Sequence, residues 1–287
     1  MSDDGVYRNG VGGHAVIEQR RTGVFRRLFF DRPVLLVVRR GVKRLEHDGV
    51  VVEGGPGTLL VVQPGAFVTV TNTVEDGLYR AEALPVDPAL VEPSALRSPV
   101  LAQMPLSEGL DAAVAAARAA LADPALPDAV AAHRFREILV WLAEAGIVPT
   151  MPVAETFAVR VRRLVSTDPA APWPAAAVAG RLATSEPTLR RHLAADGTTL
   201  TDIVADVRLS AALNLLQTTR RPVTAIALDC GYASPSRFAM RFRARFGLSP
   251  SEVRIEPVGF DRIGATIDRS GAAAAPAAGQ DRRRHPT

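Results

Sequence analysis

Two segments of the C-terminal half share one pattern of apolar residues, and this repeat constrains the fold more than any other feature of the chain. Each segment has two apolar residues, a short turn, and then two apolar residues four positions apart. The first has Val178, Ala179, Leu189 and Leu193 around the turn ATS, and the second has Ile226, Ala227, Phe238 and Phe242 around the turn GYAS. Apolar residues spaced by four lie on one face of a helix. The sequence therefore predicts two helix-turn-helix units of similar design.

The residues at the two turns support this prediction. Ser185 and Ser234 stand where the second helix of each unit begins, and serine is a preferred N-cap residue. Pro235 follows directly, and its φ is already suitable for a first helical turn. Gly231 can adopt the positive φ that a tight bend requires. Between the units, residues 200–218 are expected to form one helix of about 28 Å, close to the roughly 34 Å between successive major-groove faces of B-DNA.

Phenylalanine and arginine alternate in the second unit in a way that separates a buried face from a charged one. A helix that begins near residue 235 places three phenylalanines on one stripe and three arginines on a neighbouring stripe: Phe238, Phe242 and Phe246, and Arg237, Arg241 and Arg245. The phenylalanines are expected to anchor the helix, and the arginines, with Arg243, to face outward where phosphates can be reached. Such a helix fits the major groove of DNA. An ordinary amphipathic surface helix is the alternative, and the repetition of the unit argues against it.

Positive charge is concentrated in the same part of the chain. Residues 151–256 hold 14 basic and 9 acidic side chains, whereas residues 1–150 hold 15 and 18. The sequence pI of about 9.9 also favours a polyanionic partner. Because Lys43 is the only lysine among the basic residues, genome composition is an alternative reason for the charge.

The N-terminal half has the pattern of a small all-β domain followed by helices. Within residues 14–106, runs such as VFRRLFF, PVLLVVRRG and GTLLVVQPG are separated by Gly and Pro about every ten residues, which predicts a small antiparallel β-barrel or sandwich. Residues 107–121 and 128–145 then have helical spacing, with Ser107 as an N-cap and Gly146 as a stop. We expect these two helices either to mediate dimerisation or to pack against the barrel.

The predicted fold class is a multidomain α+β chain, with a small β-barrel, the helices that follow it, and an all-α domain that carries two helix-turn-helix units. The expected divisions are a disordered N-terminus at 1–13, a β-barrel domain at 14–106, a helical dimerisation or linker region at 107–150, a DNA-binding domain at 151–256 and a disordered tail at 257–287. The tail is assigned from its composition, which is low in complexity and poor in large apolar residues.

Residues 226–254 carry a specific resemblance to a known family. The segment IALDCGYASPSRFAMRFRARFGLSP, followed by Arg254, and the segment RLSAALNLL both resemble the AraC/XylS family of bacterial transcription regulators. The segment LLVVRRGVKRLEHDGVVVEGGPGTLLVVQPG is similar to the cupin-type regulatory domain found in part of that family. The resemblance implies a cytoplasmic, sequence-specific regulator of the activator kind, whose partners are promoter or operator DNA, a small-molecule effector bound in the N-terminal barrel, RNA polymerase and a second copy of the chain. It implies no cofactor, metal or membrane.

In family members the early residues of each second helix contact DNA bases. Carried over position by position, this implies DNA contact by Glu186, Pro187, Arg190 and Arg191 in the first unit, and by Pro235, Ser236, Arg237, Ala239 and Arg241 in the second. Arg190 and Arg191 can each donate two hydrogen bonds to guanine or clamp a phosphate. Met240 stands where relatives commonly have a basic residue, which argues against a phosphate contact at that position. Pro235, Ser236 and Ala239 offer little hydrogen bonding, which predicts weaker sequence readout through the second helix than through the first.

Two other classes of protein are considered. A metal-dependent oxygenase or isomerase is disfavoured because its barrel needs clustered histidines and a carboxylate, and residues 14–106 offer only His14 and His47, without a His-x-His pair. The single cysteine, Cys230, excludes an internal disulfide and is expected to be a small core residue. A DNA-binding regulator that senses no effector, and whose N-terminal domain serves only for assembly, is the other alternative.

Overall fold

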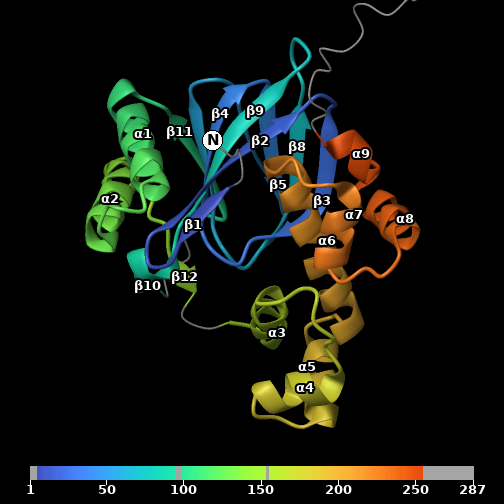
Figure 1. Ribbon diagram of the computed structural model, residues 1–287. Coiled ribbons are helices and arrows are strands. Elements are labelled where there is room, and N and C mark those ends of the chain that lie inside the picture. The colour runs from blue at the N-terminus through green and yellow to red at the C-terminus, as the bar shows by residue number, and fades with distance from the viewer. Residues whose placement is uncertain (1–4, 95–98, 153–154, 255–287) are drawn as a thin grey trace, which may run out of the picture. The chain divides into compact units, whose positions relative to one another are not determined.

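The N-terminal part of the protein consists of two antiparallel β-sheets (Figure 1). We describe it from a computed structural model, which covers residues 5–94, 99–152 and 155–254. A six-stranded sheet has the order β1-β2-β9-β4-β7-β11, and a four-stranded sheet has the order β3-β8-β5-β6. Their strands are β1 (Val6–Arg8), β2 (Gly12–Gln19), β3 (Gly23–Phe29), β4 (Val34–Arg40), β5 (Val42–His47), β6 (Val50–Gly54), β7 (Thr58–Val62), β8 (Phe67–Thr73), β9 (Tyr79–Pro85) and β11 (Leu101–Pro105). The predicted small barrel is confirmed.

The two central strands β4 and β7 are buried on both faces, which explains why their sequences do not alternate. Leu36 and Val38 lie in the cluster inside the barrel, whereas Leu35 and Val37 lie in a second cluster on the outer face of the same sheet. A strand with apolar neighbours on both sides has a continuous apolar run. Strand β5 alternates instead, because Lys43 and Leu45 are buried while Arg44 and Glu46 are exposed.

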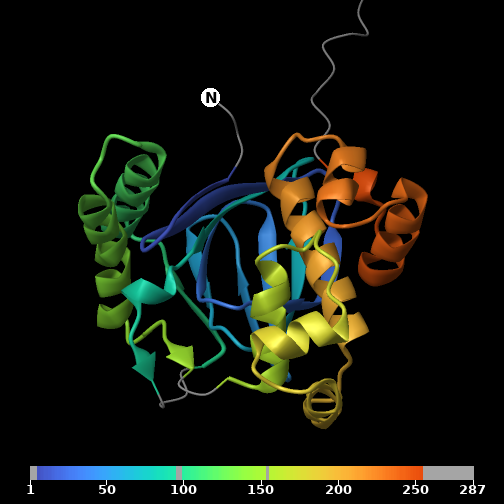
Figure 2. The same cartoon turned by 60° about the horizontal axis from the view of Figure 1, so that its bottom comes forward.

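Two helices cover the outer face of the six-stranded sheet. They are α1 (Glu108–Ala122) and α2 (Asp128–Glu144), and they lie on the other side of the barrel from the C-terminal helices in Figure 2. Leu110 and Val114 of α1, and Phe135 and Ile138 of α2, pack against the apolar residues of β4 and β7. The Ser107 hydroxyl accepts a hydrogen bond from the Leu110 N–H at 3.3 Å, as predicted for an N-cap. Packing against the barrel is therefore one role of these helices.

Residues 5–13 differ from the sequence prediction of a disordered N-terminus. Strand β1 pairs with β2, and the Tyr7 hydroxyl donates a hydrogen bond to Asp87 at 2.9 Å. Arg8 forms an ion pair with Asp128 at the start of α2. Backbone pairing and these two polar contacts give the segment an ordered place at the sheet edge, which composition alone did not indicate. The predicted disordered tail lies outside the described residues.

The connecting segments contain two very short strands and one turn of 3-10 helix. These are η1 (Pro88–Leu90), β10 (Pro93–Ser94) and β12 (Met151–Pro152), and β10 pairs with β12 in parallel. The connecting chain near residue 150 is therefore paired with the segment that follows η1.

The C-terminal part is all helical and contains both predicted helix-turn-helix units. Its helices are α3 (Phe157–Ser166), α4 (Ala175–Arg181), α5 (Glu186–Ala195), α6 (Leu200–Thr218), α7 (Val223–Asp229), α8 (Pro235–Phe246) and α9 (Pro250–Val253). Helices α4 and α5 form the first unit, α7 and α8 form the second, and α6 connects them. The prediction of a single spacer helix over residues 200–218 is confirmed.

The two units have separate apolar cores. Leu189 and Leu193 of α5 pack with Val161 of α3 and Ile203 of α6 in one cluster. The second unit instead joins the cluster inside the barrel, which contains all three phenylalanines of α8. Cys230 is buried in that cluster, as predicted, and burial raises the pKa of its thiol to about 11. The second unit and the barrel therefore share one core.

The turns of the two units have the same backbone conformation but different residues. Gly231 has φ +78°, and the first unit places Ala183 at φ +52° in the equivalent position after α4. A Cβ at Gly231 would lie 2.8 Å from Cζ of Arg208, whose guanidinium donates to the Gly231 carbonyl at 3.2 Å. The second turn therefore requires glycine for two reasons, whereas the first tolerates alanine with strain.

We expect Gly231→Ala and Ala183→Gly to change stability in opposite directions. Gly231→Ala should lower the free energy of unfolding by about 1–2 kcal/mol, because it adds left-handed strain and displaces Arg208. Ala183→Gly should raise it by about 0.5 kcal/mol, because relief of strain exceeds the entropy gained by the unfolded chain. Urea unfolding monitored by far-UV circular dichroism measures both. A stabilised Gly231→Ala variant would contradict the assignment of this turn.

Candidate nucleic-acid interface and adjoining cavity

Helix α5 exposes the residues that the sequence predicts to contact DNA. The Ser185 hydroxyl caps the helix by accepting from the Thr188 N–H at 3.3 Å, while Leu189 and Leu193 are buried. This orientation leaves Pro187, Arg190 and Arg191 exposed and Glu186 half-buried. Arg190 donates a 3.5 Å hydrogen bond to Glu186 one turn away, which orients its guanidinium along the helix.

Helix α8 presents a similar surface in the second unit. The Ser234 hydroxyl accepts from the Arg237 N–H at 3.4 Å, and the phenylalanine stripe is buried as predicted. Pro235, Ser236, Arg237 and Arg241 are exposed, and Ala239 is half-buried. Met240 is 66% exposed. The outer face of α8 therefore offers two arginines and an apolar side chain.

Arg245 does not join the outward-facing arginines, contrary to the predicted stripe. Its guanidinium pairs with Asp206 of α6 at 2.8 Å and donates to the backbone carbonyls of Arg26 and Arg27 in β3. A bulge between Phe25 and Leu28 interrupts the pairing of β3 with β8 at that point, which leaves the carbonyls available. Arg245 is therefore a contact between α8 and the barrel.

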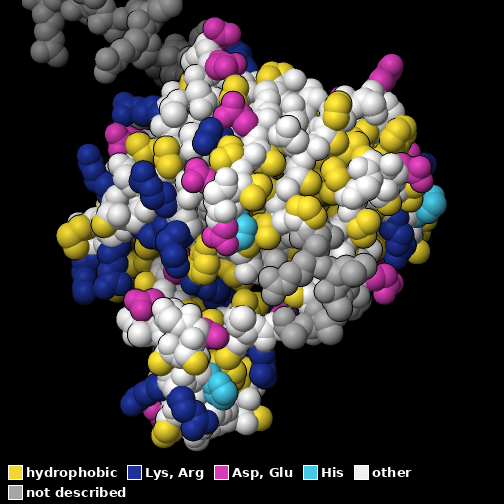
Figure 3. All heavy atoms as spheres, turned by 180° about the vertical axis from the view of Figure 1, so that it is seen from behind, with side chains coloured by type: hydrophobic (Ala, Val, Ile, Leu, Met, Phe, Trp, Pro, Cys, Tyr) yellow, Lys and Arg dark blue, Asp and Glu magenta, His cyan; other side chains and the backbone are white. Residues whose placement is uncertain are grey.

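Four arginines near the starts and outer faces of α5 and α8 carry no ion pair among the described residues. They are Arg191, Arg237, Arg241 and Arg243. In Figure 3 basic side chains gather along the edge of the molecule that α8 forms and again around the end that carries α4 and α5. Exposed guanidinium groups without internal carboxylates are available to phosphates.

Arg208 holds the two units against the spacer helix. Its guanidinium donates to three backbone carbonyls, those of Pro169 at 2.8 Å, Ala171 at 3.0 Å and Gly231 at 3.2 Å. These carbonyls come from the segment before the first unit and from the turn of the second. The sequence resemblance covers Arg208 but did not suggest this role. An arginine at the centre of the spacer helix, between Val207 and Leu209, was the available signal.

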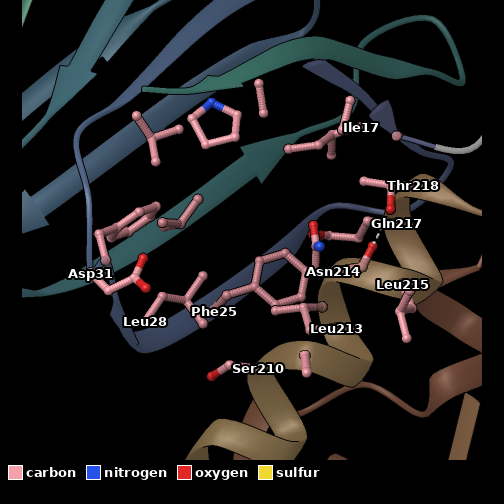
Figure 4. Close-up of a pocket in the computed structure, with 18 of the residues that line it drawn as sticks. Ile17, Phe25, Leu28, Asp31, Ser210, Leu213, Asn214, Leu215, Gln217 and Thr218 are labelled. Carbon is pink, nitrogen blue, oxygen red and sulfur yellow. Dashed lines mark hydrogen bonds between the residues drawn. The ribbon is translucent and has the colours of Figure 1, made fainter. Parts of the chain in front are cut away.

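A cavity of about 690 Å³ lies where the barrel meets α6 (Figure 4). Apolar residues of the barrel, among them Ile17, Phe25 and Leu28, form one side of it, and Leu213 and Leu215 of α6 form part of the other. The sequence predicts an effector site within the barrel. In the structure the cavity is lined by both the barrel and α6. Its size is that of typical small-molecule sites.

Several polar groups interrupt the apolar walls. Asp31 and Arg32 of the barrel, Arg221 near α7 and Ser210 of α6 all line the cavity, and the Ser210 hydroxyl has no hydrogen-bond partner among the described residues. Tyr7 also lines it; burial and the hydrogen bond to Asp87 raise the pKa of its hydroxyl to about 12. A small molecule here could therefore combine apolar contact with a few hydrogen bonds.

The described residues give no sign of a metal centre or a membrane span. None of the clusters of His, Cys, Asp and Glu in residues 5–94, 99–152 and 155–254 could hold a metal ion. His14 instead lies 2.7 Å from Glu82, whose carboxylate also pairs with Arg39 and Arg118. In the same part of the chain no helix combines the length and the apolar character needed to cross a bilayer.

Comparison with known proteins matches the C-terminal part to transcription regulators. A family model described as "Helix-turn-helix domain" matches residues 178–255. The HTH-type transcriptional regulator YdeO of Escherichia coli is 39% identical over 97 residues, which are 34% of this chain and 38% of that protein. The ornithine utilization regulator of Pseudomonas aeruginosa is 39% identical over 112 residues, which are 39% of this chain and 33% of that protein. The matched segment thus spans less than two fifths of these relatives.

Solved structures resemble nearly the whole fold. An apo variant of ToxT from Vibrio cholerae matches with a TM-score of 0.63 at 16% identity, over 86% of this chain and 97% of that one. Wild-type ToxT with an unsaturated fatty acid bound matches with a TM-score of 0.59 at 15% identity, over 83% and 93% of the two chains. At this level of identity the similarity establishes the fold, an N-terminal β domain followed by a helical domain with two helix-turn-helix units.

We expect Asp206→Asn to loosen the contact between barrel and α8. Asp206 neutralises both Arg162, at 2.6 Å, and Arg245, and all three side chains are largely buried. Loss of the carboxylate leaves two partly buried guanidinium groups unpaired, which should lower the free energy of unfolding by about 2 kcal/mol. Faster hydrogen exchange in β3, measured beside unchanged exchange in α4 and α5, checks the location of the effect. Unaltered exchange in β3 would show that this ion pair does not hold the junction.

Proposed function

We propose that this chain, whose residues 178–255 form a helix-turn-helix domain of the AraC type, is a sequence-specific transcription regulator controlled by a small molecule. The observation that carries the proposal is the pair of capped helices, α5 and α8, each anchored by a buried apolar stripe and each exposing arginines. Their support on one continuous spacer, α6, allows a single chain to place two helices in adjacent major grooves.

The proposed base contacts come from the exposed beginnings of the two helices. In α5 these are Glu186, Pro187, Arg190 and Arg191, and in α8 they are Pro235, Ser236, Arg237 and Ala239, with Arg241 on the backbone. Arg191 is the strongest candidate for a guanine contact, because Arg190 is already paired with Glu186. In α8 the methyl groups of half-buried Ala239 and exposed Met240 suit thymine methyl groups better than hydrogen-bonding base edges.

The small molecule binds in the cavity between the barrel and α6. A ligand there contacts both the regulatory domain and the helix that supports the two DNA-reading helices. The ligand therefore favours those arrangements of the barrel and α6 in which it contacts both of them. ToxT, whose fold is similar, has been solved with an unsaturated fatty acid, which supports a largely apolar effector for this chain. A ligand that fills the cavity but leaves DNA affinity unchanged would contradict this control.

The other proposed partners are a second copy of the chain and RNA polymerase. Helix α2 exposes Val130, Val140 and Trp141 on its outer side, away from the barrel, and this apolar surface favours a homodimer. The proposed division of labour follows the predicted boundaries: the regulatory domain at 14–106, the dimerisation region at 107–150 and the DNA-binding domain at 151–256. The RNA polymerase contact rests on the sequence resemblance.

Arg191→Ala should weaken binding to the preferred sequence selectively. If Arg191 makes a bidentate guanine contact, its loss should cost about 1–3 kcal/mol with that sequence and much less with nonspecific DNA. Sites are first selected from random duplexes by the full chain, and affinity is then measured by gel-shift titration. Arg44→Ala removes an equal charge from the exposed face of β5 and serves as the control. Equal weakening by both variants would remove Arg191 from the reading surface.

Arg241→Ala should weaken binding to all sequences alike. A phosphate contact contributes affinity through counterion release and carries no sequence information. We therefore expect the slope of log affinity against log salt concentration to fall by about 1, with the ratio of specific to nonspecific affinity unchanged. Titrations at several salt concentrations with a selected and an unrelated duplex measure both quantities. A loss confined to the selected duplex would instead identify Arg241 as a base contact.

A further inference from the structure

Four polar side chains form a layer inside the otherwise apolar barrel. Lys43 on β5 is opposite Asn72 on β8, and Gln19 on β2 is opposite Tyr79 on β9, so each sheet contributes one cross-strand pair. All four residues are at most 2% exposed. Polar residues at such positions are uncommon in the core of a small barrel, and the cavity described above reaches this layer, because Lys43 and Asn72 line it.

The layer contains more hydrogen-bond donors than acceptors. The Lys43 ammonium donates to Oδ1 of Asn72 at 2.6 Å, and Nδ2 of Asn72 donates to Oε1 of Gln19. Nε2 of Gln19 and the hydroxyl of Tyr79 have no partner among the described residues. Lys43 itself has three N–H bonds to donate, and its Nζ lies 5.3 Å from the centre of the Tyr79 ring. Donors therefore remain unused on three of the four side chains.

Unused buried donors of this kind destabilise a protein unless something accepts their hydrogen bonds. An unsatisfied buried polar group lowers the stability of a protein, and a buried cation without a carboxylate lowers it further. Burial alone lowers the pKa of Lys43 to about 7. No Asp or Glu of the described residues forms an ion pair with it. The arrangement lacks a hydrogen-bond acceptor. An acceptor with one negative charge would both accept these hydrogen bonds and neutralise the ammonium.

We propose that Lys43, where this polar layer meets the cavity beside Asn72, is the subsite for the carboxylate head of an otherwise apolar effector. The proposal rests on the proposed function, because it assigns the chemical class of the molecule that enters the cavity. A carboxylate supplies a single negative charge and acceptors for the N–H bonds that the Lys43 ammonium does not donate to Asn72. A phosphate dianion would bring a second charge that the layer does not neutralise. The apolar remainder of the ligand lies against Ile17, Phe25 and Leu213.

A carboxylate at this subsite makes binding depend on pH. Asn72 and Tyr79 are the groups that contact Lys43, and of these only Tyr79 titrates, far above neutrality, because burial raises its pKa. The ionisable side chains elsewhere in the cavity wall are Tyr7, His14, Asp31, Arg32, Arg162 and Arg221. An anion binds the protonated form of Lys43 and raises its pKa, so as long as the acid itself is ionised its affinity is full below about pH 7 and falls as the pH rises, by up to about tenfold per unit.

Lys43 is the only lysine of the chain, which allows it to be observed alone. The full-length protein is labelled with lysine carrying ¹⁵N at Nζ and ¹³C at Cε, and the pKa of the single side chain is followed by NMR. The probes are decanoate, oleate and 2-naphthoate, each compared with its corresponding neutral alcohol. We expect at least one acid to raise the pKa of Lys43 by about one unit or more, which corresponds to a tenfold coupling. The alcohols should leave that pKa low.

Two substitutions on the same strand separate a binding role from a structural one. Lys43→Met keeps the volume but removes the charge, and it should weaken binding of the active acid at least about tenfold at pH 6 while sparing the alcohol. Arg44→Met, on the opposite face of β5, is the matched control and should bind as the parent does. Retained DNA binding by Lys43→Met, measured by gel shift, shows that the variant is folded.

The outcomes distinguish this subsite from the proposed function. If no acid raises the pKa of Lys43, or if an acid binds equally well to Lys43→Met, the polar layer is only a structural network and the inference fails. Thermal stabilisation by a probe that leaves the lysine signal unmoved would place the ligand elsewhere in the cavity, which also overturns the subsite but leaves the regulator intact. If instead an acid binds through Lys43 and DNA affinity does not change, the subsite stands and effector control fails.

Discussion

The apolar cluster that runs from inside the barrel through α6 to α8 is the interaction on which the rest of the structure depends. Phe25 of β3 meets Phe246 of α8 edge to face at 6.0 Å, and Phe246 meets Phe242 at 4.7 Å. Neither the barrel nor the second helix-turn-helix unit buries all its large side chains alone; each uses the other's surface. Because apolar packing is dense and has few alternative arrangements, this shared core fixes the position of α8 relative to the regulatory sheet.

That constraint explains how the charged side chains divide their roles. Arg245 is on the side of α8 that meets the barrel, where it forms an ion pair with Asp206 and donates to two β3 carbonyls. Arg237 and Arg241 are on the outer side and are exposed to solvent. The first unit has its own core with α3, and among the described residues that core includes no side chain of the sheet. Helices α5 and α8 are thus held differently: the core around α5 is formed by the helical domain, and the core around α8 by the helical domain and the barrel together. A change at the barrel is expected to act first on α8.

The sequence predicted those features that local patterns determine. The repeated apolar spacing, Ser185, Ser234 and Gly231 were sufficient for two capped helix-turn-helix units, and the Gly- and Pro-separated runs for a small barrel. Features that depend on tertiary contact were not predicted. Helical spacing places Arg245 on the same stripe as Arg241, but it cannot indicate that the bulge of β3 lies next to Arg245. That contact is formed only when the barrel and α8 pack together. Lys43 is an intermediate case: the alternation of β5 already puts it on the same face as Leu45, which is the one local sign that it is buried.

The cavity lies beside the shared core, at the junction of the barrel and α6, where a small ligand can contact both. Its walls belong to the barrel and to α6, so the free energy of ligand binding depends on the relative position of the two. Linkage then requires reciprocity: if the ligand favours one placement of α6, DNA that favours the same placement raises ligand affinity by an equal factor. If the polar layer holds an acid head at Lys43, the length of the apolar remainder determines how much of the ligand is left to contact Leu213 and the rest of α6. On that proposal the junction would respond to effector length as well as to head-group chemistry.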